Sequence, residues 1–131
     1  MSADPVDLLR RFRRIAVVGC SATPGKDAHE IPKHMLHHGY DIIPINPGAA
    51  EIFGVRAYPT LADAPGPIEI VDVFRPPAEA PAVARQAVAA GAKALWLQLG
   101  IRSEEARRIA EEAGLLYVED RCLKVELRKL R

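Results

Sequence analysis

The sequence predicts an α/β fold: a three-layer, Rossmann-like, doubly wound parallel sheet of about five strands. Two observations lead to this fold class. Apolar runs alternate with helical segments of roughly ten residues, which is the spacing that right-handed crossovers between parallel strands require. In addition, the runs IAVVG, IEIVDVF and KALWLQLG are apolar almost without interruption, as expected of strands that helices cover on both faces.

Local signals place each element along the chain. Asp4 and Pro5 are residue types preferred at a helix start, and they predict an N-terminal helix that ends before Arg13. Strands are predicted at residues 15–19, 41–46, 68–74, 93–99 and 115–119. Helices are predicted at residues 28–38, 78–90 and 103–113, each followed by a glycine (Gly39, Gly91, Gly114), with a short helix at the end of the chain.

The connection between the second and third predicted strands is rich in turn-forming residues and is the longest irregular segment. Within it, residues 55–58 are expected to form a short strand, and Thr60 precedes one helical turn. Pro44 indicates an irregularity in the second strand, because proline removes one hydrogen bond from the ladder. Pro32 fits best in the first turn of its helix, where a missing N–H is tolerated.

Length, charge and cysteine content limit the classes of function. With 131 residues, the chain is expected to form a single domain over residues 1–131. Its net charge of +1 lacks the basic excess of general nucleic-acid-binding proteins, so we expect no nucleic-acid partner. No apolar leader or bilayer-spanning run is evident, and the two cysteines are far apart in the sequence. We therefore expect a cytoplasmic protein with free thiols and no membrane contact.

Ligands of doubly wound sheets bind beyond the carboxyl ends of the strands, where the strand order reverses. Residues that follow predicted strands at this edge are Cys20, Ser21, Lys26, Asn46, Pro47, Arg75, Gln98, Gly100, Arg102, Arg121 and Cys122. Four of these loops carry a lysine or an arginine, and the helix after the first turn adds free N–H groups. This clustering predicts a polyanionic ligand. The alternative is that these lysine and arginine side chains are loop residues that contact only solvent.

The first turn, GCSATPG, matches neither of the standard phosphate-binding motifs. Five residues separate Gly19 from Gly25, and Asp27 follows Lys26, whereas a Walker A loop has four residues between its glycines and a Ser or Thr after its lysine. The turn also lacks the pattern G-x-G-x-x-G, and the second strand ends in Asn46 rather than in an acidic residue, which disfavours NAD. The neutral Asn46 leaves room for an adenosine with a phosphorylated ribose.

Histidines and cysteines suggest alternative chemistry. The stretch HEIPKH resembles the zinc motif H-E-x-x-H, but its second histidine comes one residue late and lies on a different helix face. His34 and His38 have a spacing that can chelate zinc, although a solvated helix face is favoured and no metal site is predicted. Cys20 and Cys122 both follow strands at the predicted edge. For Cys20, a small side chain that fills a tight turn is favoured over a reactive thiol.

Five motifs, VVGCS…GK, GYDIIPINP, IVDVFR, LWLQLGI and DRC, occur in this order and resemble the free-standing CoA-binding proteins. That family is similar to the nucleotide-binding N-terminal domain of the succinyl-CoA synthetase alpha subunit, and the resemblance covers about residues 10–127. It implies a Rossmann-like fold that binds coenzyme A, or an acyl-CoA, at the predicted edge.

The resemblance also implies roles for individual residues. The pyrophosphate would lie against Gly19, Cys20 and Ser21, with Lys26 as its charge partner. The adenosine would be flanked by Asn46 and Pro47. The nucleotide would lie against Val73, Phe74 and Arg75. The pantetheine arm would contact Gln98, Leu99 and Gly100.

Departures from the synthetase limit what the resemblance implies. Catalysis in the synthetase needs a phosphorylated histidine from a second domain and a nucleotide-grasping subunit, so ligase activity by this chain alone is not implied. We therefore expect a CoA-binding protein that is not catalytic by itself. The alternative is a small thioester- or thiol-exchange enzyme that uses Cys20 and Cys122 with CoA. The sequence leaves open both a homo-oligomer and an unidentified ligase partner.

Overall fold

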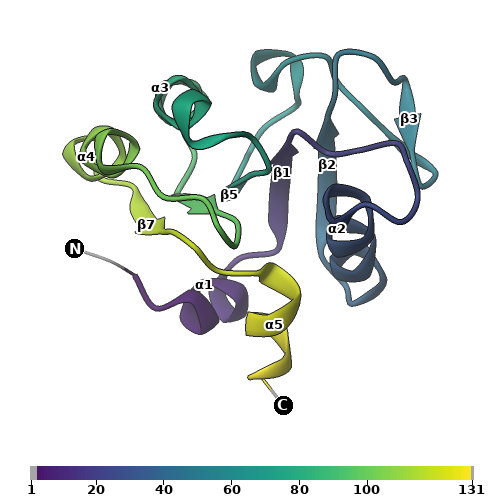
Figure 1. Cartoon of the computed structure of the whole chain (residues 1–131), viewed down its shortest axis with the longest axis horizontal. Helices are drawn as coiled ribbons and strands as arrows, with labels where there is room; N and C mark the ends of the chain where they lie inside the picture. Colours follow the sequence, from purple (N-terminus) through teal and green to yellow (C-terminus); the bar gives the residue numbers. More distant parts are fainter. Residues whose placement is uncertain (1–2, 131) are drawn as a thin grey trace.

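The computed structural model describes residues 3–130, which contain a five-stranded parallel sheet with strand order β2-β1-β5-β6-β7 (Figure 1). The strands are β1 (Arg14–Val18), β2 (Asp41–Ile45), β5 (Ile70–Val73), β6 (Ala94–Leu97) and β7 (Leu116–Val118). Each neighbouring pair in this sheet is parallel. The predicted fold class and the predicted number of main strands are therefore confirmed.

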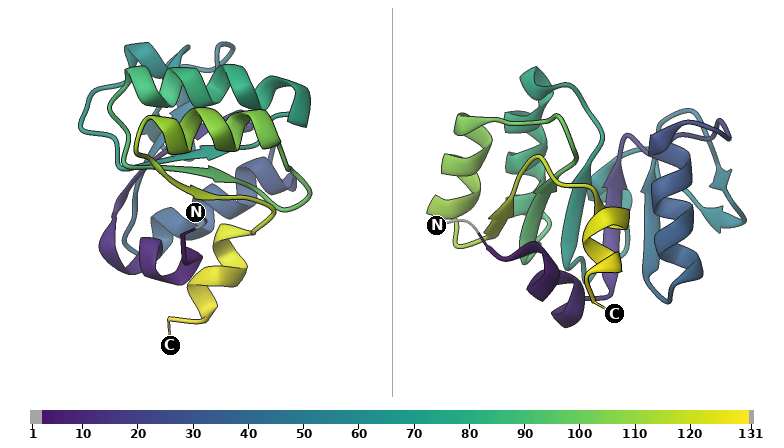
Figure 2. Two further views of the ribbon diagram at one scale, coloured as in Figure 1. Left: turned by 90° about the vertical axis from the view of Figure 1, so that its left-hand side faces the viewer. Right: turned by 60° about the horizontal axis from the view of Figure 1, so that its bottom comes forward.

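Helices cover both faces of the sheet and complete a three-layer architecture (Figure 2). One face carries α3 (Ala80–Ala89) and α4 (Glu104–Glu112). The opposite face carries α1 (Pro5–Arg11), α2 (Asp27–His37) and α5 (Leu123–Arg128). Two predicted caps are present: the Asp4 side chain accepts the N–H of Val6, and the Ser103 side chain accepts the N–H of Ala106. No helix within residues 3–130 combines the length and the hydropathy that crossing a bilayer requires.

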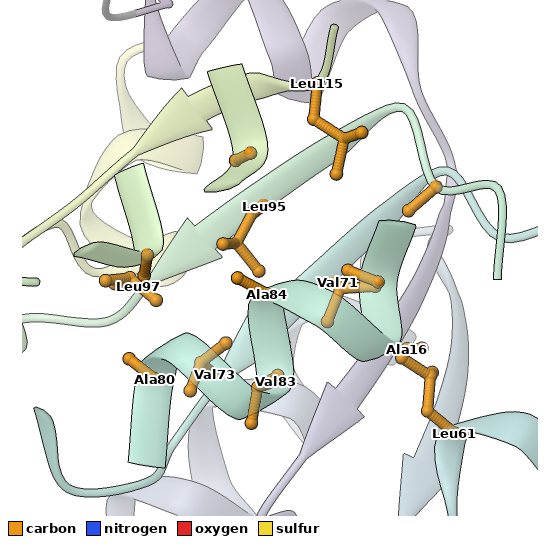
Figure 3. Packing of buried hydrophobic residues seen from close by; sticks show 14 of the residues in the cluster. Ala16, Leu61, Val71, Val73, Ala80, Val83, Ala84, Leu95, Leu97 and Leu115 are labelled. Carbon is orange, nitrogen blue, oxygen red and sulfur yellow. The ribbon is translucent and has the colours of Figure 1, made fainter. Parts of the chain in front are cut away.

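Side chains are buried on both faces of the sheet. On the face of α3 and α4, strand residues pack against the small side chains of α3, as Figure 3 shows for Val71, Val73, Leu95, Ala80, Val83 and Ala84. On the other face, strand residues pack against α1, α2 and α5, among them Ile15, Val17, Ile70 and the fully buried Trp96. This two-sided burial is the reason for the uninterrupted apolar runs of the sequence.

The ends of several elements differ from the prediction. The strands predicted at residues 68–74 and 93–99 are shorter, and Gln98 and Leu99 already belong to the turn after β6. The helix predicted from residue 78 begins instead at Ala80, after the 3-10 turn η2 (Pro77–Glu79). The expected strand at residues 55–58 is one half of a hairpin, β3 (Glu51–Ile52) and β4 (Val55–Arg56), whose first half was not predicted. The turn η1 (Leu61–Asp63) follows Thr60 as predicted.

Two prolines lie within regular elements. The prediction for Pro32 is wrong, because α2 begins at Asp27 and places this proline beyond the first turn. The missing N–H of Pro32 leaves the Ala28 carbonyl without its helical donor, and the N–H of Ser21 donates to that carbonyl at 2.9 Å. Pro44 is tolerated because β2 is an edge strand of the sheet.

Candidate functional site

The strand order reverses between β1 and β5, whose carboxyl ends lead directly into Gly19 and Phe74. Gly19 has a φ of +87°, and a Cβ at this position would lie 2.5 Å from the Phe74 carbonyl oxygen. The same Cβ would lie 2.9 Å from Cδ of Arg75. Glycine alone allows both this conformation and this approach, so the ends of β1 and β5 stay close together and the Arg75 stem lies across the turn.

Contacts with neighbouring elements hold the loop between β1 and α2. The Ser21 carbonyl oxygen lies 2.8 Å from Nδ1 of the buried His29. The side-chain amide of Asn46 donates to the Cys20 carbonyl at 2.9 Å, which ties the loop after β2 to the loop after β1. Together with the bond from Ser21 to Ala28, these contacts fix the backbone of the loop.

The same loop leaves several backbone donors unengaged. Within residues 3–130, no acceptor receives the N–H groups of Cys20, Ala22, Asp27 and Ala28. No side chain caps α2, whereas the Glu30 carboxylate at 3.0 Å accepts the N–H of Gly25, a bond that lowers the pKa of Glu30. Free N–H groups in a loop and at a helix N-terminus can together bind an anion.

A cavity of about 680 Å³, which we call the loop cavity, opens beside this loop. Its walls come from the ends of β1 and β2, from the connection before η1 and from α3. The predicted site residues that line it are Gly19, Cys20, Ser21, Asn46, Pro47 and Arg75. The opposite wall was not predicted from the sequence, and it includes Pro59, Thr60, Glu79, Val83 and Gln86.

A second cavity of about 500 Å³, the Cys122 cavity, also borders Arg75. The predicted site residues that line it are Phe74, Arg75, Gln98 and Leu99. Further lining residues come from α2 and from the region of α5, among them Asp27, Glu30, Cys122 and Lys124. Oε1 of the buried Gln98 accepts the N–H of Leu123 at 3.2 Å, so the end of β6 is tied to the start of α5.

Three predicted site residues line neither of these two cavities. Val73 is fully buried between the sheet and α3. Lys26 is exposed at the start of α2. Gly100 lies in the turn after β6, and its N–H donates to Oδ1 of Asp120 at 2.7 Å.

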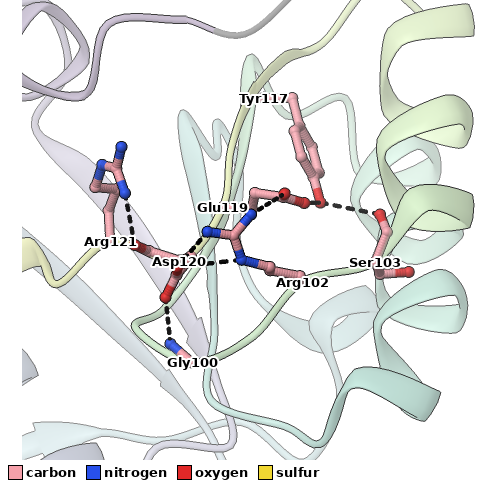
Figure 4. A network of polar contacts seen from close by, with 7 residues as sticks. All are labelled: Gly100, Arg102, Ser103, Tyr117, Glu119, Asp120 and Arg121. Carbon is pink, nitrogen blue, oxygen red and sulfur yellow. Dashed lines mark hydrogen bonds and ion pairs between the residues drawn. The ribbon is translucent and has the colours of Figure 1, made fainter.

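Arg102 and Arg121, two of the four cationic positions predicted at this edge, belong to a polar network instead (Figure 4). Nη2 of Arg102 donates to Oδ2 of Asp120 at 2.7 Å, and Nη1 of Arg102 lies 3.5 Å from Oε2 of Glu119. Nη1 of Arg121 donates to the Asp120 carbonyl at 3.0 Å. Bonds from the Gly100 N–H and from Arg102 lower the pKa of Asp120.

The sequence predicted four cationic side chains close to the ligand site, and the structure places only one of these four, Arg75, beside the two cavities. The cations that border the two cavities are Arg75, which borders both, and Lys124, which lies in the Cys122 cavity. Arg75 itself is paired: its Nε and Nη2 atoms donate to the Glu79 carboxylate at 2.8 to 3.0 Å. Neither cavity thus carries a large excess of positive charge.

The two cysteines have different environments, and both are free thiols in the structure. The Cys20 side chain is buried, and this burial, with a smaller effect of Asp72, raises the pKa of the thiol to about 12. The thiol therefore remains protonated at neutral pH, in line with the expectation that it fills a tight turn. Cys122 is partly exposed and lines the Cys122 cavity.

The histidines of α2 engage in other contacts. The rings of His34 and His38 stack with centroids 4.1 Å apart, and Nδ1 of His38 lies 2.8 Å from the His34 carbonyl oxygen. His29 packs edge-on against the Phe53 ring. In the part of the chain that the structure describes, no three His, Cys, Asp or Glu side chains are grouped to hold a metal ion.

The parallel sheet and the glycine turn at its switch point define a Rossmann-like domain. The chain belongs to the CoA binding domain family, whose sequence profile matches residues 13–128, and the family resemblance is thereby confirmed. It is 41% identical over 123 residues to the uncharacterized protein YneT of Bacillus subtilis strain 168, a match that covers 94% of this chain and 91% of that protein.

Two further comparisons support the fold and the family. A hypothetical protein from Pyrococcus horikoshii OT3 superposes with a TM-score of 0.92 at 39% identity, covering 98% of this chain and 92% of that one. The ADP-forming acetate–CoA ligase II of Archaeoglobus fulgidus is 29% identical over 101 residues. That match covers 76% of this chain but only 15% of the ligase. The chain is thus homologous to the CoA-binding domains of ADP-forming acetyl-CoA synthetases.

Proposed function

We propose that this chain binds coenzyme A or an acyl-CoA across the two cavities and that it does not catalyse a reaction by itself. The observation that carries the proposal is that Arg75 borders both cavities at the switch point of the sheet. A ligand with a phosphorylated nucleotide at one end and a long neutral arm at the other can place its pyrophosphate at Arg75 and one end in each cavity.

The loop cavity suits the 3′-phospho-ADP end of this ligand. The unengaged N–H groups of the loop and the Arg75 guanidinium are donors for the pyrophosphate. Asn46 introduces no carboxylate that would repel a phosphorylated ribose, and the Glu79 carboxylate in the same cavity is paired with Arg75. Pro59 and Val83 provide apolar wall for a planar base. Lys26 and Val73 are not needed for this arrangement, because neither lines the cavity.

The Cys122 cavity suits the pantetheine arm, which is uncharged and rich in amides. The charges of its lining residues cancel, because two are acidic (Asp27 and Glu30) and two are basic (Arg75 and Lys124). Part of its lining is apolar and comes from Phe74, Leu99 and Ile101. The side-chain amide of Gln98 can form a hydrogen bond with an amide of the arm.

The family and the ligase relative support CoA as the ligand, because CoA appears in the names of both. The chain corresponds to only 15% of that ligase, so we do not extend the ligase reaction to it. Storage, sensing or delivery of CoA to another protein are functions that a binding domain of this kind can perform.

Calorimetric titration with CoA, dephospho-CoA, acetyl-CoA, NAD and ATP tests the proposal. We expect CoA and acetyl-CoA to bind at least tenfold more tightly than NAD and ATP, and dephospho-CoA to bind more weakly than CoA because it lacks the ribose phosphate. Equal affinities for all five compounds, or no binding of CoA, would contradict the proposal.

A second candidate function is thioester exchange, in which the Cys122 thiol takes the acyl group of an acyl-CoA and CoA leaves as the free thiol; it has support from Cys122 alone, because that thiol lines the cavity assigned to the arm. The raised pKa of the Cys20 thiol argues against a role for Cys20 in exchange. An exchange enzyme would lose its activity in the variant Cys122→Ser while retaining its affinity for CoA. A pure binding protein would show no exchange in either form.

A further inference from the structure

Two contacts fix the side chain of Arg75 at opposite ends. Its aliphatic stem crosses the turn at Gly19, where the missing Cβ leaves room for Cδ. Its guanidinium is held by Glu79, to which Nε donates at 3.0 Å and Nη2 donates at 2.8 and 2.9 Å. Both the stem and the head of this long side chain therefore have contacts within the chain.

The contact with Glu79 uses only one edge of the guanidinium. An arginine head carries five N–H donors in a planar fork, and the edge formed by Nε and Nη2 is the one that faces Glu79. Within residues 3–130, Nη1 of Arg75 has no acceptor. Arg75 borders both cavities, and its Nη1 retains two N–H donors that no acceptor within residues 3–130 uses.

The chain geometry fixes where the Glu79 carboxylate lies. Pro76 and Pro77 restrict the backbone from Arg75 into the 3-10 turn η2, of which Pro77 is the first residue and Glu79 the last, directly before α3. The two side chains remain 45% and 48% exposed, and an exposed ion pair of this kind contributes little to folding. The pair is therefore better explained by what it does for Arg75 than by stability.

We infer that Glu79 is a positioning residue: it holds Arg75 in the orientation in which Nη1 donates to a phosphate of the ligand between the two cavities. This inference rests on the proposed function and gives Glu79, which also lines the loop cavity, a role that acts through Arg75. The opposite relationship, in which Glu79 competes with the phosphate and must leave Arg75 first, predicts the opposite result for the same variants.

The test compares Glu79→Ala and Glu79→Gln by calorimetric titration with CoA and with ADP. We expect E79A to weaken the binding of both ligands about tenfold, equivalent to about 1.4 kcal/mol. E79Q should lose less, because its amide oxygen still accepts a hydrogen bond from the guanidinium. The control Glu105→Ala breaks another exposed ion pair, with Arg85, outside both cavities and should leave affinity unchanged.

A double-mutant cycle separates positioning from a general structural effect. In the background Arg75→Met, which retains an unbranched stem but has no donors, E79A should change the affinity for either ligand less than twofold. An equal loss in both backgrounds, or tighter binding by E79A in the wild-type background, would overturn the inference. If the wild type binds ADP but not CoA, the proposed function fails, and the double-mutant cycle measured with ADP still decides the role of Glu79. If the wild type binds neither ligand, the proposed function and the role of Glu79 both fail.

Discussion

The backbone of Gly19 passes so close to Phe74 that a Cβ on residue 19 would lie 2.5 Å from the Phe74 carbonyl oxygen. This contact joins the ends of β1 and β5, the two strands between which the strand order reverses. A side chain at residue 19 would have to push these strand ends apart, and with them the boundary between the two cavities.

We therefore expect Gly19→Ala to destabilise the fold by about 2–4 kcal/mol, the sum of an alanine in the left-handed region and of local overpacking. Urea unfolding measures the change in the free energy of unfolding. The matched control is Gly25→Ala, because Gly25 has a φ of +95° but a Cβ there would project into open space, with no contact within 4 Å. The control should cost only about 1–2 kcal/mol, and equal losses at the two positions would contradict the contact.

Arg75→Met should weaken the binding of CoA more than Lys26→Ala does. Arg75 borders both cavities, whereas Lys26 lies outside them. Removal of a charge-assisted contact to the pyrophosphate should cost about 1.5–3 kcal/mol of binding free energy, and K26A should cost less than about 1 kcal/mol. Calorimetry measures both, with Arg85→Met as a control outside the cavities. A larger loss for K26A would move the phosphate site to the helix start.

Asp72 should make the stability of the fold decrease as the pH rises. Its carboxyl group lies in β5 and is fully buried, and burial raises its pKa well above the ordinary value, against a smaller opposing effect of the Val73 N–H. The folded state therefore retains a proton that the unfolded chain releases above a pH of about 4. The contribution of Asp72 is fully present below that pH and is lost as the pH rises toward the folded pKa.

The variant Asp72→Asn removes this titration. Its free energy of unfolding, relative to the wild type, should therefore increase with pH above about 4, by up to about 1.4 kcal/mol per pH unit. Asp120→Asn provides a comparison of opposite sign, because the pKa of Asp120 is lowered and its contribution is lost as the pH falls. A difference between D72N and wild type that does not change with pH would show that Asp72 ionises normally.

The two cysteines should react at different rates with a thiol-alkylating reagent. Cys20 is buried and its pKa is raised to about 12, so its thiolate fraction at pH 8 is on the order of one in ten thousand. Mass spectrometry after brief treatment with iodoacetamide should find Cys122 modified and Cys20 unmodified, and Cys122→Ser should lose the rapid reaction. Rapid modification of Cys20 would contradict its protected environment.

The sequence was sufficient to predict the sheet and the edge at which the cavities lie. Apolar runs, glycine stops and polar caps are local signals, and the carboxyl ends of parallel strands meet at one edge. Gly19, Asn46 and Arg75 could therefore be grouped from the sequence alone. Their assignment as ligand contacts is still a prediction.

The features that were missed depend on tertiary packing. Gln86 lines the loop cavity because α3 lies against the sheet in one particular orientation, which helix periodicity does not specify, and Glu79 lines it from the turn η2 directly before α3. Arg102 is paired with Asp120 from the next strand end, so counting cations along the sequence overstated the charge available to a ligand. One local signal was present: the spacing of four residues between Arg75 and Glu79, across two prolines, is suited to an ion pair.

A crystal structure of the chain with bound CoA would test the central claim most directly. We expect the pyrophosphate beside Nη1 of Arg75, the 3′-phospho-ADP end in the loop cavity and the arm in the Cys122 cavity. CoA bound elsewhere on the protein, or with both of its ends on one side of Arg75, would contradict this account.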